Sequence, residues 1–206
     1  MDRIEKILRD QREELLSTDF SQFVPRQEEQ EIDLNSRLAQ IVIGVRRCGK
    51  STLCQKVLFQ SNVQFAYVNF DDETLSSLQS TQLNDILEML YRIYGTFTHL
   101  FMDEIQNVPS WHLFVNRLMR QGIHLVLTGS NANLLSGELS THLTGRYNEI
   151  RLFPFSFAEY CQAKGIATDA LTTKSSGLLL HALDTYLMHG GFPETLTMSR
   201  QDKYIS

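Results

Sequence analysis

The eight residues from Gly44 to Ser51 limit what this chain can fold into more than any other feature. They read Gly-Val-Arg-Arg-Cys-Gly-Lys-Ser and match the pattern G-x-x-x-x-G-K-[ST] at every fixed position. Glycine in this pattern lets backbone amides approach phosphate oxygens without a Cβ in the way. Residues 39–43 are typical of a buried strand, and residues 51–59 of a helix. The sequence therefore predicts a strand, a phosphate-binding loop and a helix that together hold a nucleoside triphosphate.

The expected nucleotide-binding residues run from the end of the strand into the helix: Gly44, Val45, Arg46, Arg47, Cys48, Gly49, Lys50, Ser51 and Thr52. Lys50 is also an expected catalytic residue, because the lysine of this pattern reaches the β- and γ-phosphates. The hydroxyl of Ser51 is expected to complete a Mg²⁺ shell. Side chains at variable positions such as Arg46 and Arg47 usually point to solvent or to neighbouring loops. The predicted ligands are ATP and Mg²⁺.

Composition narrows the class of protein. The chain has 206 residues, of which 42% are apolar and 21% charged, and this suits one ordinary domain plus a smaller appendage. A formal charge of −5 does not favour a dedicated nucleic-acid surface. The three cysteines lack CxxC spacing, so a zinc site or disulfide framework is not expected. A charged N-terminus and the lack of a long apolar run predict a cytoplasmic protein with no membrane contact.

The chain is predicted to have three parts. Residues 1–38 form an N-terminal helix (1–17) and a polar connector with at most one short helix; residues 39–165 form the nucleotide-binding core; residues 166–206 form a helical lid or the start of a further domain. Five buried strands and amphipathic helices alternate in the core, with strands expected at 39–43, 64–70, 99–102, 123–127 and 149–152 and helices at 51–59, 84–93 and 111–120. A last helix is expected at 178–188. This alternation predicts a parallel sheet covered on both faces, with ligands at the carboxyl ends of the strands.

Asp103 and Glu104 follow the third predicted strand. An aspartate here can hold a Mg²⁺ shell, usually through water. Glu104 is suited to polarise an attacking water, a role that hydrolysis requires and phosphoryl transfer to a second substrate does not. The alternative is a solvated acidic turn, but the upstream phosphate loop favours the metal and general-base roles.

Two further residues are expected to contact the γ-phosphate. Ser130, or else Asn131, ends the fourth strand and can sense whether that phosphate is still attached, although Gly-Ser-Asn is also ordinary turn chemistry. Arg146 can stabilise charge on the transferring oxygens, from within the chain or across a subunit boundary. Alternatively, Arg146 lies on the surface or pairs with a carboxylate such as Glu149.

Several segments together resemble the AAA+-type predicted ATPases of bacteria and archaea: Gly44–Thr52, Tyr67–Asp72, Leu100–Gln106, Leu127–Asn131, Gly145–Arg146 and Leu152–Tyr160. The resemblance implies an α/β P-loop fold of the ASCE/AAA+ type, in three α/β/α layers with sheet order 5-1-4-3-2. It also implies that Gly44–Thr52 is the Walker A loop and that Asp103 and Glu104 are the Walker B pair. Such proteins usually carry a further C-terminal domain, so the last helical segment is expected to begin a truncated one.

The leading functional hypothesis is an ATPase that couples Mg²⁺-dependent ATP hydrolysis to a conformational change in a larger protein or assembly. The alternatives are a nucleotide-dependent regulatory switch with little turnover of its own, and a DNA-associated AAA+ module. Expected partners are ATP and either a second copy of the chain or a protein reached through the missing C-terminal domain. Val24, Pro25 and Arg26 are a candidate edge of the base pocket.

Overall fold

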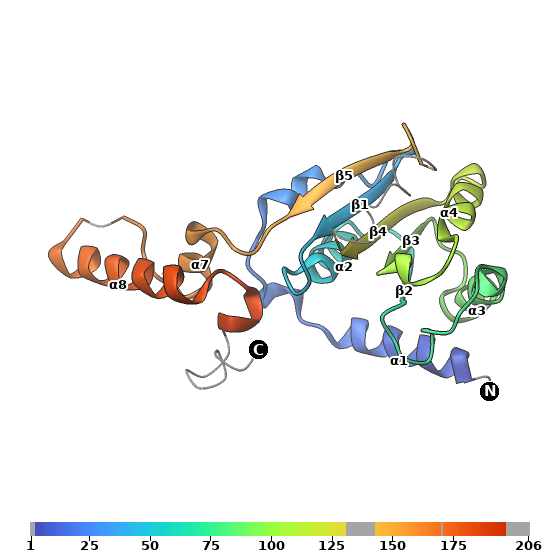
Figure 1. Ribbon diagram of the computed structural model, residues 1–206, viewed down its shortest axis with the longest axis horizontal. Coiled ribbons are helices and arrows are strands. Elements are labelled where there is room, and N and C mark those ends of the chain that lie inside the picture. The colour runs from blue at the N-terminus through green and yellow to red at the C-terminus, as the bar shows by residue number, and fades with distance from the viewer. Residues whose placement is uncertain (1–2, 131–142, 170, 197–206) are drawn as a thin grey trace.

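The computed structural model describes residues 3–130, 143–169 and 171–196 and contains one five-stranded sheet (Figure 1). The strands are β1 (Ala39–Gly44), β2 (Phe65–Asn69), β3 (His99–Asp103), β4 (His124–Ser130) and β5 (Tyr147–Leu152). All four pairings are parallel and the spatial order is β2-β3-β4-β1-β5. This strand order confirms the predicted 5-1-4-3-2. Because all the pairings are parallel, the carboxyl ends of the strands lie at one edge of the sheet.

Helices cover both faces of this sheet. They are α1 (Arg3–Ser17), α2 (Lys50–Gln60), α3 (Leu83–Tyr94) and α4 (Trp111–Arg120). Ile41 and Ile43 of β1 pack in one core with α3 and α4, whereas Val42 packs in a second core with α2. Because side chains alternate between the faces of a strand, β1 separates these two cores. The result is the predicted three-layer α/β/α arrangement.

The connector between α1 and β1 contains two 3₁₀ helices, where at most one short helix was expected. The first spans Phe20–Gln22 and is capped by Asp19, whose carboxylate accepts a hydrogen bond from the backbone N–H of Ser21 at 3.0 Å. The second spans Gln27–Glu31. Its carboxylate Glu29 accepts from the backbone N–H of Arg26 at 2.8 Å. Such local side-chain bonds compensate for unpaired amides at the start of a short helix.

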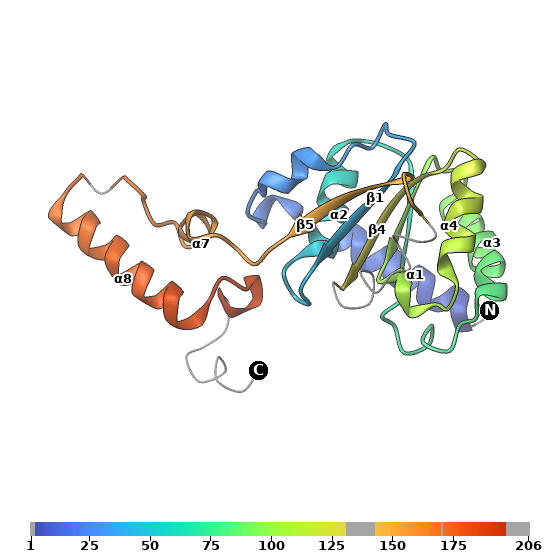
Figure 2. The same cartoon turned by 45° about the horizontal axis from the view of Figure 1, so that its top comes forward.

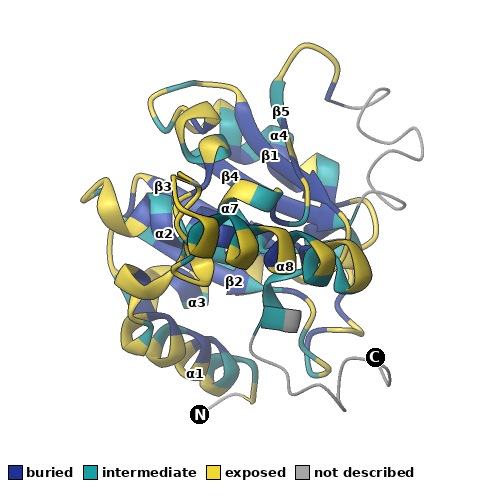
Figure 3. Cartoon of the chain, turned by 90° about the vertical axis from the view of Figure 1, so that its left-hand side faces the viewer, coloured by how far each residue is buried: buried dark blue, intermediate teal, exposed yellow. Residues whose placement is uncertain are grey.

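Two helices, α7 (Phe157–Ala163) and α8 (Thr173–His189), follow the sheet and project away from it (Figures 1 and 2). Helix α8 begins five residues before the expected 178–188, because Thr172 caps it by accepting from Ser175 N–H. Helix α7 was not predicted, although Ser156 and Glu159 form the capping pattern S-x-x-E at its start. The outward side of α8 is exposed (Figure 3). No helix in the described ranges is long and apolar enough to cross a membrane.

Candidate functional site

The predicted phosphate-binding loop joins β1 to α2 and lies beside the end of β5. A Cβ on Gly44 would clash with the carbonyl oxygen of Leu152 in β5 and lie 2.9 Å from Cys48 Sγ, so only glycine fits this approach. Gly49 has φ +100°, a conformation that L side chains rarely adopt, and α2 begins at the next residue. The unpaired amides at the start of α2 thus point into the loop, as anion binding requires.

Lys50 is the buried cation of this loop, with 4% of its surface exposed. Its Nζ donates to the carbonyl oxygens of Gly44 at 3.3 Å and Val45 at 3.2 Å, and it forms an ion pair with Glu104 Oε1 at 3.5 Å. The amine therefore lies over the loop where its phosphate ligand is expected. Its ion-pair partner Glu104 is the predicted general base.

Asp103 ends β3 directly beneath the loop. Its Oδ1 accepts hydrogen bonds from Ser51 Oγ at 2.8 Å and from Thr128 Oγ1. Burial raises the pKa of this carboxyl to about 6, although the two hydroxyl donors oppose the rise. These oxygen donors fit Mg²⁺, which prefers carboxylate, hydroxyl and water ligands. Ser51 and Asp103, the two predicted metal ligands, are therefore in contact.

Thr128 of β4 is a site residue that the sequence analysis missed. It is fully buried, donates to Asp103, and its Oγ1 accepts from the backbone N–H of Glu104 at 3.0 Å. One hydroxyl thus holds both acidic residues in place. Side-chain alternation is the signal that could have found it, because Thr128 is two residues before Ser130 and shares its face of the sheet.

Ser130 and Arg146 occupy very different places. Ser130 ends β4, is half-buried and lies opposite Gly44 in the strand register, next to the loop. Arg146 directly precedes β5, at the edge of the sheet where strands begin; its backbone carbonyl accepts from Ala39 N–H at the start of β1. Its guanidinium is exposed and donates to Asn116 of α4 at 3.0 Å. Parallel strands place Arg146 at the opposite edge of the sheet from the loop, away from a nucleotide bound to its own chain, and its role stays a prediction.

The other predicted positions divide by burial. Cys48 is buried and Thr52 half-buried, whereas the side chains of Val45, Arg46 and Arg47 are exposed. Burial raises the pKa of the Cys48 thiol. Asn131 lies outside the described residues.

A cleft of about 490 Å³ opens above these groups. Its lining includes Lys50, Ser51, Asp103 and Glu104 from the core, with Asn69 and Asp71 after β2 and Pro193 and Glu194 after α8. Two exposed ion pairs cross it: Arg46 with Asp71 at 2.6 Å and Arg47 with Glu194 at 3.1 Å. The sequence did not predict that the segment after α8 lies at the site. Its residue Glu194 is 147 positions after Arg47 in the chain.

A second, smaller cavity of about 90 Å³ adjoins the cleft and shares Gly49, Thr52 and Pro193 with it. Val24 and Arg26, two of the three residues proposed for the base pocket, line this cavity, whereas Pro25 lines a different groove. The remaining walls are mainly apolar: Phe23, Cys48, Leu53 and Phe155, with Glu29 and Lys56 at one side.

A parallel sheet of this order, with a G-x-x-x-x-G-K-[ST] loop after β1 and an acidic pair after β3, defines a P-loop nucleotide-binding domain. The comparison with protein families agrees. The chain belongs to the AAA domain family, whose model matches residues 36–161. This membership supports nucleotide binding in general.

Individual relatives show how much of the chain is similar to other proteins. An uncharacterized protein of Methanocaldococcus jannaschii is 35% identical over 80% of this chain and 37% of its own length. An uncharacterized protein of Haemophilus influenzae is 34% identical over 76% of this chain and 40% of its own length. The chain thus spans about two fifths of these relatives. Among solved structures, the Walker-type ATPase of Pyrococcus abyssi has a similar fold, with a TM-score of 0.52 and 18% identity over 83% of this chain and 65% of that one.

Proposed function

We propose that this chain binds Mg²⁺-ATP, hydrolyses it and couples hydrolysis to a conformational change in a larger protein or assembly. One observation carries the proposal: Ser51, Asp103, Thr128, Glu104 and Lys50 form one contiguous polar cluster beneath a glycine-containing loop. The cluster brings together the phosphate-binding, metal-binding and water-activating groups that ATP hydrolysis needs.

The residues divide the work as follows. Loop amides and Lys50 would hold the phosphates, while Ser51 and Asp103 would hold Mg²⁺, which would neutralise charge on the phosphate oxygens. Glu104 accepts a proton from the attacking water, and Ser130 bonds the γ-phosphate. Since the Lys50 amine lies 3.5 Å from Glu104, binding of phosphate to Lys50 would weaken this ion pair and free the carboxylate for water. The base of the nucleotide occupies the smaller cavity.

Arg146 is proposed to act across a subunit boundary. It is exposed at the start of β5, which is an edge strand of the sheet, and so it can face a neighbouring copy. Mixing Lys50→Ala with Arg146→Ala chains tests this idea, because a mixed interface pairs an intact loop with an intact arginine. We expect each variant alone to be inactive and the mixture to regain ATP hydrolysis. A mixture as inactive as its components would refute action in trans.

The experiment that tests the main proposal compares ATP binding and hydrolysis by the wild type, Lys50→Ala and Glu104→Gln. We expect Lys50→Ala to lose binding, and Glu104→Gln to keep binding while hydrolysis falls by about 10²-fold or more. Glu88→Gln is the matched control, since Glu88 pairs with Arg92 on the exposed side of α3, outside the cleft. Wild-type levels of hydrolysis by Glu104→Gln would remove Glu104 from the mechanism.

A regulatory switch with little turnover is a second candidate, and two contacts favour it. Lys50 is paired with the proposed general base, and Arg47 in the loop is paired with Glu194 after α8. Both contacts would restrain hydrolysis until nucleotide or a partner separates them. Glu194→Gln distinguishes the two functions: faster turnover of the variant supports the switch, and unchanged turnover supports the simple ATPase.

A further inference from the structure

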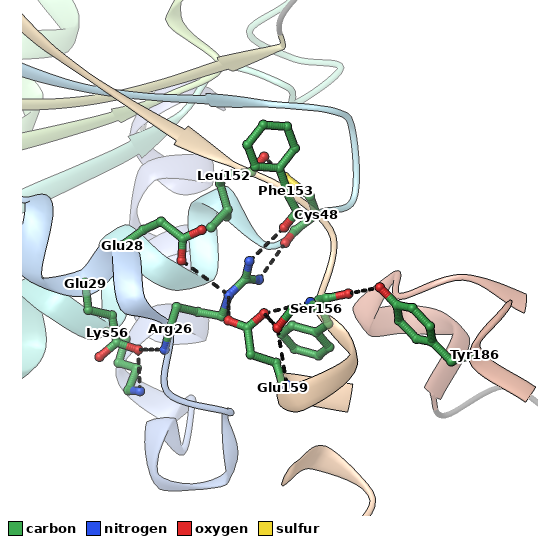
Figure 4. Close-up of polar contacts among 11 residues, drawn as sticks. Arg26, Glu28, Glu29, Cys48, Lys56, Leu152, Phe153, Ser156, Glu159 and Tyr186 are labelled. Atoms are coloured by element: carbon green, nitrogen blue, oxygen red, sulfur yellow. Dashed lines mark hydrogen bonds and ion pairs between the residues drawn. The ribbon is translucent and has the colours of Figure 1, made fainter. Parts of the chain in front are cut away.

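Arg26 is a buried cation at the junction of four segments of the chain (Figure 4). Its Nη2 donates to the carbonyl oxygen of Phe153 after β5 at 2.7 Å, and its Nη1 to that of Cys48 in the phosphate-binding loop at 3.5 Å. Its Nε lies 2.7 Å from Glu159 Oε1 and 3.7 Å from Glu28 Oε2. The Nε–H has no aligned hydrogen-bond acceptor among the described residues, so these two contacts are purely ionic.

Glu159 transmits the position of Arg26 to helix α7. Its other carboxylate oxygen accepts from both the backbone N–H and the hydroxyl of Ser156, the N-cap residue, at 2.8 Å, so Glu159 completes the capping box of α7 (Figure 4). Tyr160 of α7 packs in turn against Ala182 and Tyr186 of α8. The carboxylate of Glu159 therefore both completes the capping box of α7 and pairs with Arg26, so the Arg26–Glu159 pair fixes the start of α7 against the connector.

The same guanidinium also forms part of the smaller cavity. Arg26 Cζ lies 4.9 Å from the centre of the Phe155 ring, and both residues line the cavity with Pro193. Phe155 and the segment after α8 are joined by a backbone hydrogen bond from Phe155 N–H to Gly191 O at 2.7 Å. Tyr186 of α8 donates to Phe155 O at 2.8 Å. One side of the cavity therefore belongs to the core, and the other is joined to α8 and the segment after it.

We propose that Arg26 is a positioning residue that couples occupation of the smaller cavity by a nucleotide base to the docking of α7 and α8 on the core. The inference rests on the proposed function, because the base of bound ATP is the occupant. Such coupling is reciprocal: a base that stabilises the docked arrangement is itself bound more tightly when the helices are docked. A ligand that carries phosphates without a base has nothing to place in this cavity, so this coupling should not affect it.

The test compares ATP with tripolyphosphate, which carries the phosphates without the base, both in the presence of Mg²⁺. Binding is measured by calorimetry, and backbone hydrogen exchange is measured over 157–189 with and without each ligand. In Arg26→Met, which keeps the apolar stem and removes the charge, we expect ATP affinity to fall by about tenfold or more. Tripolyphosphate affinity should stay within about twofold, since the bond from Arg26 to the loop, at Cys48 O, is long at 3.5 Å and both Lys50 and the loop amides are retained. In the wild type, ATP but not tripolyphosphate should protect α7 and α8 from exchange, and Arg26→Met should lose that protection.

Glu159→Gln is the second variant, since it keeps the shape of the side chain and removes its charge. If Arg26→Met unfolds, the same affinity and exchange measurements on Glu159→Gln test the inference. Arg92→Met is the matched control on the exposed face of α3. An equal loss of ATP and tripolyphosphate affinity would overturn the inference, because Arg26 would then support the loop itself. Unchanged ATP affinity in a folded variant would overturn it as well. If the wild type binds neither ligand, it is the proposed function that fails.

Discussion

Replacing the proposed metal ligand Asp103 by asparagine should stabilise the metal-free protein at neutral pH. Burial raises the pKa of this carboxyl from an ordinary value of 3.8 to about 6. Each pKa unit corresponds to about 1.4 kcal/mol, so at pH 7 ionised Asp103 costs the folded state about 3 kcal/mol. The amide oxygen of asparagine can still accept from Ser51 and Thr128, which are the donors in the wild type. We therefore expect Asp103→Asn to gain about 1–3 kcal/mol of unfolding free energy at pH 7.

The stability gain of Asp103→Asn should depend on pH. Because the pKa is raised in the folded state, the protonated form stabilises the wild type at low pH, and this stabilisation is lost as the pH rises through about 6. The gain of Asp103→Asn should consequently shrink to about half between pH 7 and pH 5. Urea unfolding without Mg²⁺ at both pH values measures it. Adding Mg²⁺-ATP should reverse the order, since only the wild type retains the metal carboxylate.

The matched control is Asp71→Asn, which removes an exposed carboxylate of the same cleft that is paired with Arg46. Exposed ion pairs contribute little, so this variant should change stability by no more than about 1 kcal/mol and should not gain. An Asp103→Asn variant that is no more stable than the wild type at pH 7 would refute the reasoning. So would a gain that stays constant down to pH 5.

Three further predictions concern single side chains. Gly44→Ala should lower the unfolding free energy by about 1–3 kcal/mol in a denaturant titration, because the new Cβ clashes with Leu152 O; an unchanged midpoint would contradict the close approach. Gly177→Ala should raise it by about 0.5–1 kcal/mol, since Gly177 lies within α8 in open space, and a loss of stability would argue against a helix there. Thr128→Val should lower kcat by about tenfold with little change in KM, because it frees Asp103 and the amide of Glu104; steady-state kinetics with an unaltered kcat would exclude this positioning role.

Local patterns of the sequence were sufficient for the parts of the site that depend on backbone conformation. The glycines of Gly44–Ser51 specify a loop that other residues cannot form, and alternating strands and helices specify a parallel sheet. Ser51 and Asp103 are in contact because both lie at the carboxyl edge that such a sheet creates. The same logic places Arg146 at the far edge, because it precedes a parallel strand, although the sequence analysis expected it at the γ-phosphate.

Only the tertiary structure brought together residues that no motif links. Arg26, Phe155 and Pro193 line one small cavity, although they come from the connector, the segment after β5 and the segment after α8. Thr128 belongs to the site because its hydroxyl bonds both the carboxylate of Asp103 and the backbone N–H of Glu104. The physical reason is that a motif encodes local dihedral angles and donor groups, whereas contacts between distant segments depend on how whole layers pack. The sequence by itself therefore determined the loop, the acidic pair and the sheet, and packing decided what surrounds them.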